Sequence, residues 1–319
     1  MPLSPRRPPG RALAPGLTLP LAVVLAGCVA AGPAASPSAS APGPPWSPSP
    51  SAGAGRSPSV GEVVPDVVYG RAEGSDLMLD AYLPASARAE AVPAVIVLHG
   101  GSFVSGDKGG LDAAPIAQLL AQEGYAAFSV DYRLLPGHPY PDALQDVQTA
   151  IRWLRQSEQV ERFGIDPARI GGFGGSAGAI LISEAGTAGE GPLDGGARLA
   201  AVVELSGAMD LTPAALTADL PQEEREVGLA YLGCSDPLDC PAAEAASPLS
   251  AVDPSDPPFF LAHSADEAIP EQPTLAMADA LRAAGVPAKL TIRPGSAHSV
   301  LMLDAGLVQD ILAFYAAFL

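Results

Sequence analysis

The stretch ARIGGFGGSAG, residues 168–178, joins a short apolar run to a serine flanked by glycines. This pattern predicts a buried strand, a tight turn and a helix, because glycine adopts backbone angles that other residues avoid. Ser176 is the central residue of a G-x-S-x-G pentapeptide, which on such a turn holds a hydroxyl where a neighbouring base can take its proton. Alone the pentapeptide is weak, because a chain with 34 glycines produces such patterns by chance.

Three further motifs agree with it. Residues 257–266, PPFFLAHSAD, run from an apolar strand to an acid, and residues 291–298, TIRPGSAH, run from another strand to a histidine. The resulting order of serine, acid and histidine is that of α/β-hydrolases. Upstream, residues 94–103, AVIVLHGGSF, place a His-Gly-Gly loop after a buried strand, and its unhindered backbone N–H groups would face a developing oxyanion.

With these motifs the chain resembles the carboxylesterases of the α/β-hydrolase superfamily over residues 63–319. The segment DYRLLPGHPYP, residues 131–141, also resembles that family. A hairpin expected before residue 94 replaces the helical cap of the hormone-sensitive-lipase-like branch, which favours the feruloyl or acetylxylan esterase-like branch. The resemblance implies a serine esterase that forms an acyl-enzyme on a small-molecule ester and needs no cofactor or metal.

The resemblance also assigns the site roles. Ser176 is expected to attack the ester carbonyl, His298 to act as the general base and Asp266 to orient the imidazole. Glu267 is the rival acid, but the spacing from Asp266 to Pro270 fits the family pattern better.

The remaining roles concern the oxyanion and the other histidines. The expected oxyanion donors are the backbone N–H groups of Gly100, Gly101 and Ala177, and His99 orients their loop. His138 and His263 are expected to be structural. Phe103 either lines a substrate pocket or belongs to the core.

Apolar runs alternate with helical patterns through most of the chain, which predicts a mainly parallel sheet with helices on both faces. The alternation lapses over about residues 207–250, where we expect a small cap insertion over the site. This insertion holds Cys234 and Cys240, which we expect to form a disulfide. A metal site is the alternative, but no nearby histidine completes a ligand set. The expected strands are 63–69, 77–83, 94–98, 126–131, 169–173, 200–205, 259–262 and 288–292, and the expected helices are 111–122, 142–155, 177–184, 222–232, 274–284 and 303–318.

The first sixty residues differ in composition from the rest. Residues 1–27 combine three arginines with an apolar run that ends in Leu-Ala-Gly before Cys28, as in a bacterial lipoprotein signal peptide. An ordinary secretion signal is the alternative. Residues 28–60 are dominated by Ala, Pro, Ser and Gly and predict a linker. We therefore expect an exported α/β-hydrolase domain, residues 61–319, that is tethered to the cell membrane by a lipid on Cys28.

The net charge of −18 argues against nucleic acid as a partner, because both molecules would be anionic. Two other functions remain open at this point. One is a noncatalytic binding lipoprotein on the same fold. The other is a serine peptidase of the prolyl-oligopeptidase type, which the lack of a propeller-sized region before the hydrolase motifs disfavours.

Overall fold

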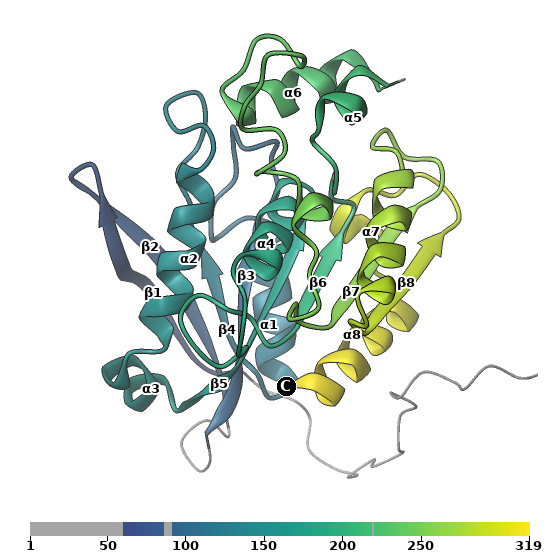
Figure 1. The fold of residues 1–319 in the computed structure, drawn as a ribbon. Coiled ribbons are helices and arrows are strands. Elements are labelled where there is room, and N and C mark those ends of the chain that lie inside the picture. The colour runs from purple at the N-terminus through teal and green to yellow at the C-terminus, as the bar shows by residue number, and fades with distance from the viewer. Residues whose placement is uncertain (1–59, 86–90, 219) are drawn as a thin grey trace, which may run out of the picture. The chain divides into compact units, whose positions relative to one another are not determined.

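The computed structural model describes residues 60–85, 91–218 and 220–319. In this part of the chain one sheet of eight strands forms the centre of the fold, in the order β1-β2-β4-β3-β5-β6-β7-β8 (Figure 1). The strands from β4 to β8 in this order are parallel, and β1 and β2 are antiparallel additions at one edge. The strands are β1 (Val60–Ala72), β2 (Ser75–Pro84), β3 (Val92–Leu98), β4 (Ala126–Val130), β5 (Ile165–Gly175), β6 (Val202–Leu205), β7 (Phe259–Ser264) and β8 (Ala288–Arg293).

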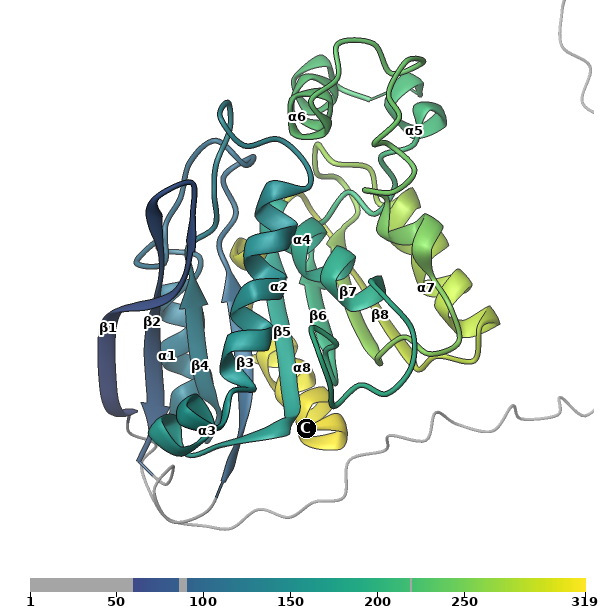
Figure 2. The ribbon, with the colours of Figure 1, turned by 60° about the vertical axis from the view of Figure 1, so that its left-hand side comes forward.

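Helices cover both faces of this sheet, as Figures 1 and 2 show. Side chains of α2, α4 and α7 enter the apolar core on one face, and those of α1 and α8 enter the core on the other. The predicted α/β-hydrolase architecture is confirmed. The helices are α1 (Ala114–Gln122), α2 (Asp142–Leu154), α3 (Ser157–Phe163), α4 (Ala177–Thr187), α5 (Pro213–Thr217), α6 (Gln222–Leu232), α7 (Gln272–Ala283) and α8 (Ala305–Phe318), with 3-10 turns η1 (Pro248–Ala251) and η2 (Ser299–Met302).

Most elements lie where the apolar pattern predicts them, but strand β1 is three residues longer at each end than expected and the short helix α5 was not predicted; three further differences have a clear cause in burial. Helix α1 begins at Ala114 instead of residue 111, because Leu111 is 92% exposed and contributes nothing to the core. Strand β5 begins four residues early, at Ile165, which is buried and pairs with β3. The short helix α3 was not predicted; it fills the connection before β5 and buries Phe163.

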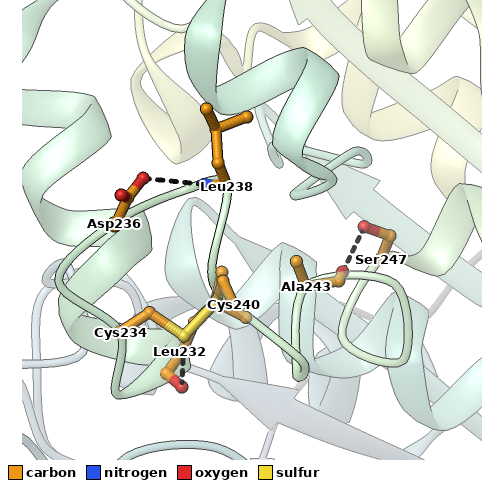
Figure 3. The surroundings of a disulfide bond; sticks show 7 residues. All are labelled: Leu232, Cys234, Asp236, Leu238, Cys240, Ala243 and Ser247. Atoms are coloured by element: carbon orange, nitrogen blue, oxygen red, sulfur yellow. Dashed lines mark hydrogen bonds between the residues drawn. A yellow bond between two sulfur atoms is a disulfide. The ribbon is translucent and has the colours of Figure 1, made fainter.

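The segment between β6 and β7 carries α5, α6 and the predicted disulfide, and Figures 1 and 2 show α5 and α6 beyond the ends of the strands. The sulfur atoms of Cys234 and Cys240 are 2.10 Å apart, in the loop that follows α6 (Figure 3). We call residues 207–250 the cap. The predicted leader, Cys28 and nearly all of the linker lie outside the described residues.

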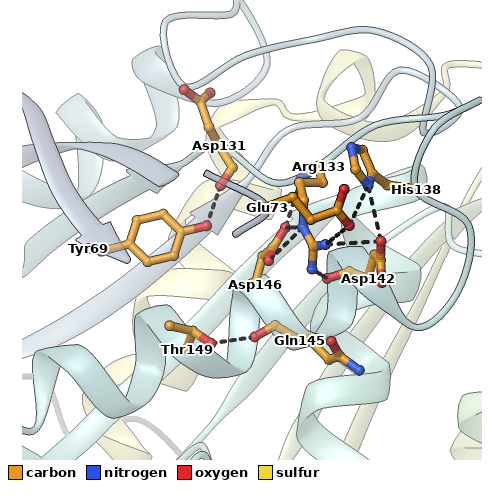
Figure 4. A network of polar contacts seen from close by, with 9 residues as sticks. All are labelled: Tyr69, Glu73, Asp131, Arg133, His138, Asp142, Gln145, Asp146 and Thr149. Atoms are coloured by element: carbon orange, nitrogen blue, oxygen red, sulfur yellow. Dashed lines mark hydrogen bonds and ion pairs between the residues drawn. The ribbon is translucent and has the colours of Figure 1, made fainter. Parts of the chain in front are cut away.

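A polar network holds the start of α2 against the β1–β2 hairpin (Figure 4). The Arg133 guanidinium donates to Asp146 at 2.8 Å and to Asp142 at 3.0 Å, and it lies 3.5 Å from Glu73 in the hairpin turn. His138 also contacts Asp142, at 3.1 Å. Glu73, His138 and Asp142 form a cluster of possible metal ligands, but both carboxylates of the cluster already form ion pairs with Arg133. Among the described helices, none has the length and apolar character to cross a membrane.

Candidate active site

Ser176 lies on the turn between β5 and α4, in a backbone conformation that few residues adopt (φ 56°, ψ −122°). A side chain at Gly174 would collide with the backbone of Gly178, and one at Gly175 would collide with the hydroxyl of Ser299. Both glycines that precede Ser176 are therefore required by close packing. The Ser176 N–H donates to Leu205 O at 2.9 Å, which fixes the turn against the neighbouring strand.

His298 lies at the end of the loop after β8, immediately before the Ser299 that packs on the nucleophile turn. The structure thus brings the loop of the predicted base to the predicted nucleophile. The Nδ1–H of the His298 imidazole donates a hydrogen bond to the carboxylate of Glu267. Such a contact fixes which imidazole nitrogen is free to act as a base.

The acid in this contact corrects the prediction that Asp266 orients His298. Asp266 is exposed at the turn after β7, and its N–H donates to Gly295 O at 3.0 Å. Glu267 is the residue that enters the interior, with only 1% of its side chain exposed. Adjacent residues on this turn face in different directions, and the longer carboxylate is on the inner side.

Four donors surround the Glu267 carboxylate. Besides His298, its oxygen Oε1 accepts from Ser206 Oγ at 2.9 Å and from the N–H of Ser264 at 2.9 Å, and the Nδ1 of His263 lies 2.8 Å away. Burial acts to raise the pKa of Glu267, but hydrogen bonds from His263, His298 and Ser264 outweigh it and lower the pKa to about 2. The carboxylate therefore stays ionised at any pH at which the protein would work.

The buried His263 contacts Glu267, which lies four residues later, but this contact forms only in the folded protein and no local pattern in the sequence selects Glu267 over Asp266. Ser206 was missed altogether. It follows β6 with a positive φ of 57°, donates to Glu267 and accepts from the N–H of Ser299 at 2.9 Å, so it ties the acid to the histidine loop.

The His-Gly-Gly loop lies against Ser176, since a Cβ placed on Gly100 would be 3.2 Å from the Ser176 Cβ. The prediction that Gly100 donates to the oxyanion is wrong, because its N–H already donates to the Asp112 carboxylate at 2.6 Å. Within the described residues, the N–H groups of Gly101, Ser102 and Ala177 have no acceptor. Ser102 therefore replaces Gly100 in the set of available donors.

His99 is buried beneath this loop, as expected of a residue that shapes it. Its Nδ1 donates to Gly100 O at 2.7 Å, and its ring stacks on Tyr132 with 4.2 Å between centroids. The Tyr132 hydroxyl donates to His99 O at 2.8 Å. His99 thus orients the loop from below and lies away from the cavity beside Ser176.

A cavity of about 490 Å³ opens beside Ser176, between the sheet and the cap. Its walls are mostly aliphatic, and its polar side chains are few. Phe103 lines it while also packing in the core, with its ring stacked on Tyr231 of α6 at 3.8 Å. The cavity is large enough for a small ester, and residues of the cap form part of its wall. Other lining residues include Ile180, Leu211, Leu216, Leu220, Val227, Leu249 and Ile269.

The family of the chain follows from a comparison with known families. A family model described as BD-FAE matches residues 79–281. The chain belongs to the BD-FAE family. This match extends from β2 into α7 and includes Ser176 and Glu267, so the family region contains both the nucleophile turn and the acid.

Curated relatives of this BD-FAE protein are esterases. Esterase LipQ of Mycobacterium tuberculosis is 30% identical over 257 residues, which are 78% of this chain and 59% of LipQ. Carboxylesterase NlhH of the same species is 38% identical over 109 residues, which are 34% of this chain and 32% of NlhH. The chain thus spans about a third of NlhH and somewhat more than half of LipQ.

Solved structures share the fold. A carbohydrate esterase from gut microbiota superimposes with a TM-score of 0.71 at 24% identity, over 82% of this chain and 98% of that one. An acetyl ester-xyloside bifunctional hydrolase from Caldicellulosiruptor lactoaceticus gives a TM-score of 0.62 at 26% identity, over 81% of this chain and 94% of that one. Because the gut carbohydrate esterase is less than 25% identical to this chain, its similarity shows the fold alone.

Proposed function

We propose that this BD-FAE protein is a serine carboxylesterase that works through an acyl-enzyme. The observation that carries the proposal is the contact between His298 and the ionised Glu267, on a loop that packs against the Ser176 turn. A nucleophile, a base and an orienting acid in this order are what ester hydrolysis by serine requires. The esterase names of the curated relatives support the same reaction.

The reaction then proceeds in two halves. Ser176 Oγ attacks the ester carbonyl while His298 Nε2 takes the hydroxyl proton, and the carbonyl oxygen becomes an oxyanion facing the N–H groups of Gly101, Ser102 and Ala177. The C–O bond to the alcohol breaks as His298 returns the proton to the leaving oxygen. Water then attacks the acyl-enzyme with the same proton transfers, which releases the acid and restores the Ser176 hydroxyl.

The cavity favours esters with short or aromatic acyl groups. Its volume of about 490 Å³ and its aliphatic walls suit a compact apolar group, and none of its described lining residues is a cation that would bind a substrate carboxylate. Acylated carbohydrates belong in the same screen, because two solved neighbours are named for such substrates.

Labelling by a fluorophosphonate probe and a chromogenic ester series from acetyl to long acyl test this function. We expect labelling and turnover by the wild type, and loss of both in Ser176→Ala. Ser250→Ala, which replaces an exposed serine in η1, serves as the control and should behave as the wild type. Labelling that persists in Ser176→Ala would overturn the proposed nucleophile, and a wild type that hydrolyses no ester would overturn the proposed reaction.

We also propose that a lipid on Cys28 tethers the protein outside the cell membrane. The sequence before and at Cys28 supports this location, and the linker that follows would hold the enzyme away from the lipid surface. Two or three acyl chains bind a bilayer stably, whereas one binds only marginally. Fractionation of cells should therefore find the wild type with membranes and Cys28→Ser in the soluble fraction with full activity. Soluble wild type would refute the tether.

A further inference from the structure

The charges that face the cavity all have one sign. Among the described lining residues, Asp210 and Glu224 are the charged ones, and none is Lys, Arg or His. Asp210 is partly engaged, since its Oδ1 accepts from the N–H of Thr212 at 2.9 Å. A carboxylate among aliphatic walls loses hydration without gaining a partner, which a ligand of opposite charge would supply.

Glu224 is the acid of the cavity lining whose charge interacts with that of His298 and Glu267. It is in the first turn of α6 and is half-buried. Burial raises its pKa, the charge of His298 acts to lower it, and the neighbouring carboxylates Glu223 and Glu267 raise it further. Glu224 and Ser176 line the same cavity, so a group of the substrate that extends from the reacting carbonyl into this cavity can meet the carboxylate.

Among the residues that the structure describes, no Lys or Arg forms an ion pair with Glu224. His298 acts on the Glu224 carboxylate only through its charge, and no ion pair or hydrogen bond joins that side chain to another described group. The adjacent Arg225 is engaged elsewhere, because its Nε donates to Leu216 O at 2.7 Å and its NH2 donates to Leu220 O at 3.2 Å. The guanidinium thus binds the connection between α5 and α6.

We propose that Glu224 makes the cavity selective for esters whose alcohol carries a positive charge, such as an alkylammonium alcohol. This inference rests on the proposed esterase function and adds the substrate class. A weakly hydrated ammonium group with alkyl substituents fits aliphatic walls and pairs with the carboxylate in the same space. A sugar would fit less well, because the aromatic ring of Phe103 is already stacked on Tyr231.

Glu224 could instead serve to stabilise the N-terminus of α6, and the same helix turn provides a control residue for this alternative. Glu223 and Glu224 both lie in the first turn, where either carboxylate stabilises the N-terminus of the helix. Glu223 is exposed and does not line the cavity. Replacing each acid by glutamine removes the same charge from the same turn, so only a role in the cavity distinguishes the two variants.

The experiment compares butyrylcholine with 3,3-dimethylbutyl butyrate, in which a carbon replaces the charged nitrogen. We expect the wild type to favour butyrylcholine by about tenfold or more in kcat/KM, as one nearby opposite charge allows. Glu224→Gln should bring the ratio close to one, and Glu223→Gln should leave it unchanged. Turnover of p-nitrophenyl butyrate reports on the esterase function itself in all three proteins.

Two results would overturn this inference while leaving the esterase function intact. In the first, the wild type hydrolyses p-nitrophenyl butyrate but does not prefer butyrylcholine, either because it hydrolyses both isosteres equally well or because it hydrolyses neither. The other is a preference that survives in Glu224→Gln. Failure of the wild type on p-nitrophenyl butyrate and on both isosteres would instead contradict the proposed function.

Discussion

The hydroxyl of Tyr231 donates a hydrogen bond to the carboxylate of Glu184 at 2.7 Å. The bond joins α6 of the cap to α4, the helix that begins directly after Ser176. The same tyrosine ring stacks on Phe103, next to the oxyanion donors. One buried side chain therefore connects the cap, the nucleophile helix and the oxyanion loop, so the cap's position and the site's geometry are coupled.

Tyr231→Phe tests this coupling. The change keeps the ring but leaves a buried carboxyl group without its donor, which costs about 1–3 kcal/mol. We expect a lower melting temperature and a lower kcat/KM. Tyr140→Phe is the control, because its hydroxyl donates to Ala245 O in an exposed bond of 3.1 Å. Equal melting temperatures for the two variants would show that the Glu184 contact contributes little.

The contact between Glu267 and His298 predicts which carboxylate activity requires. Glu267→Gln keeps the shape of the side chain but removes the charge that orients and stabilises the imidazole, so kcat should fall by roughly 10⁴, as in the serine-protease precedent. Asp266→Asn changes an exposed side chain and should leave kcat near the wild-type value. Steady-state kinetics of both variants decide the question, and the reverse pattern would restore Asp266 as the acid.

The choice between these neighbours shows how far the sequence determines the site. The apolar alternation and the G-x-S-x-G pattern depend on local spacing, and both predict the observed strands and the nucleophile turn. Which carboxylate enters the interior depends instead on tertiary hydrogen bonds. The N–H of Ala265 donates to Arg293 O and that of Asp266 to Gly295 O, so the end of β8 and the loop after it set the direction of the turn.

The free N–H groups of the oxyanion loop likewise depend on tertiary contacts. A His-Gly-Gly motif shows that backbone N–H groups are accessible, but it does not show which of them are free. The N–H of Gly100 is occupied by Asp112, twelve residues later, and only the folded loop reveals that contact. The available donors are accordingly displaced by one residue along the chain, to Gly101 and Ser102.

Gly101→Ala tests the donors. Gly101 has a φ of 107°, and a Cβ there would collide with the carbonyl of Ser105, so the loop must shift. Displacing one donor costs about a hundredfold or more in kcat. Gly137→Ala is the control, since Gly137 has no atom within 4 Å of an added Cβ. A folded Gly101→Ala enzyme, judged by circular dichroism, that keeps the wild-type kcat would place the donors elsewhere.

The pH dependence of stability tests the surroundings of the acid. The pKa of Glu267 is about 2 in the folded protein, below its ordinary value of 4.5. A lowered pKa stabilises the fold above pH 4.5, and this contribution, on the order of 3 kcal/mol, is lost as the pH falls from 4.5 towards 2. His263, which is buried and 2.8 Å from the carboxylate, supplies one of the responsible donors.

A pair of variants separates this donor from packing. His263→Asn keeps an N–H near the position of Nδ1, whereas His263→Leu removes it, and the titration of the imidazole is lost equally in both. Without the donor the pKa of Glu267 moves up towards 4.5, so the leucine variant should have the lower free energy of unfolding at pH 7. This difference in the free energy of unfolding exists only while Glu267 is ionised. As the pH falls from 4.5 towards 2, Glu267 becomes protonated in the folded and unfolded chains of both variants, so the difference between the variants should narrow. Denaturant unfolding at pH 7, 5, 4 and 3 measures this difference. A difference that stays constant with pH would mean that His263 stabilises the fold by packing and does not set the charge of Glu267.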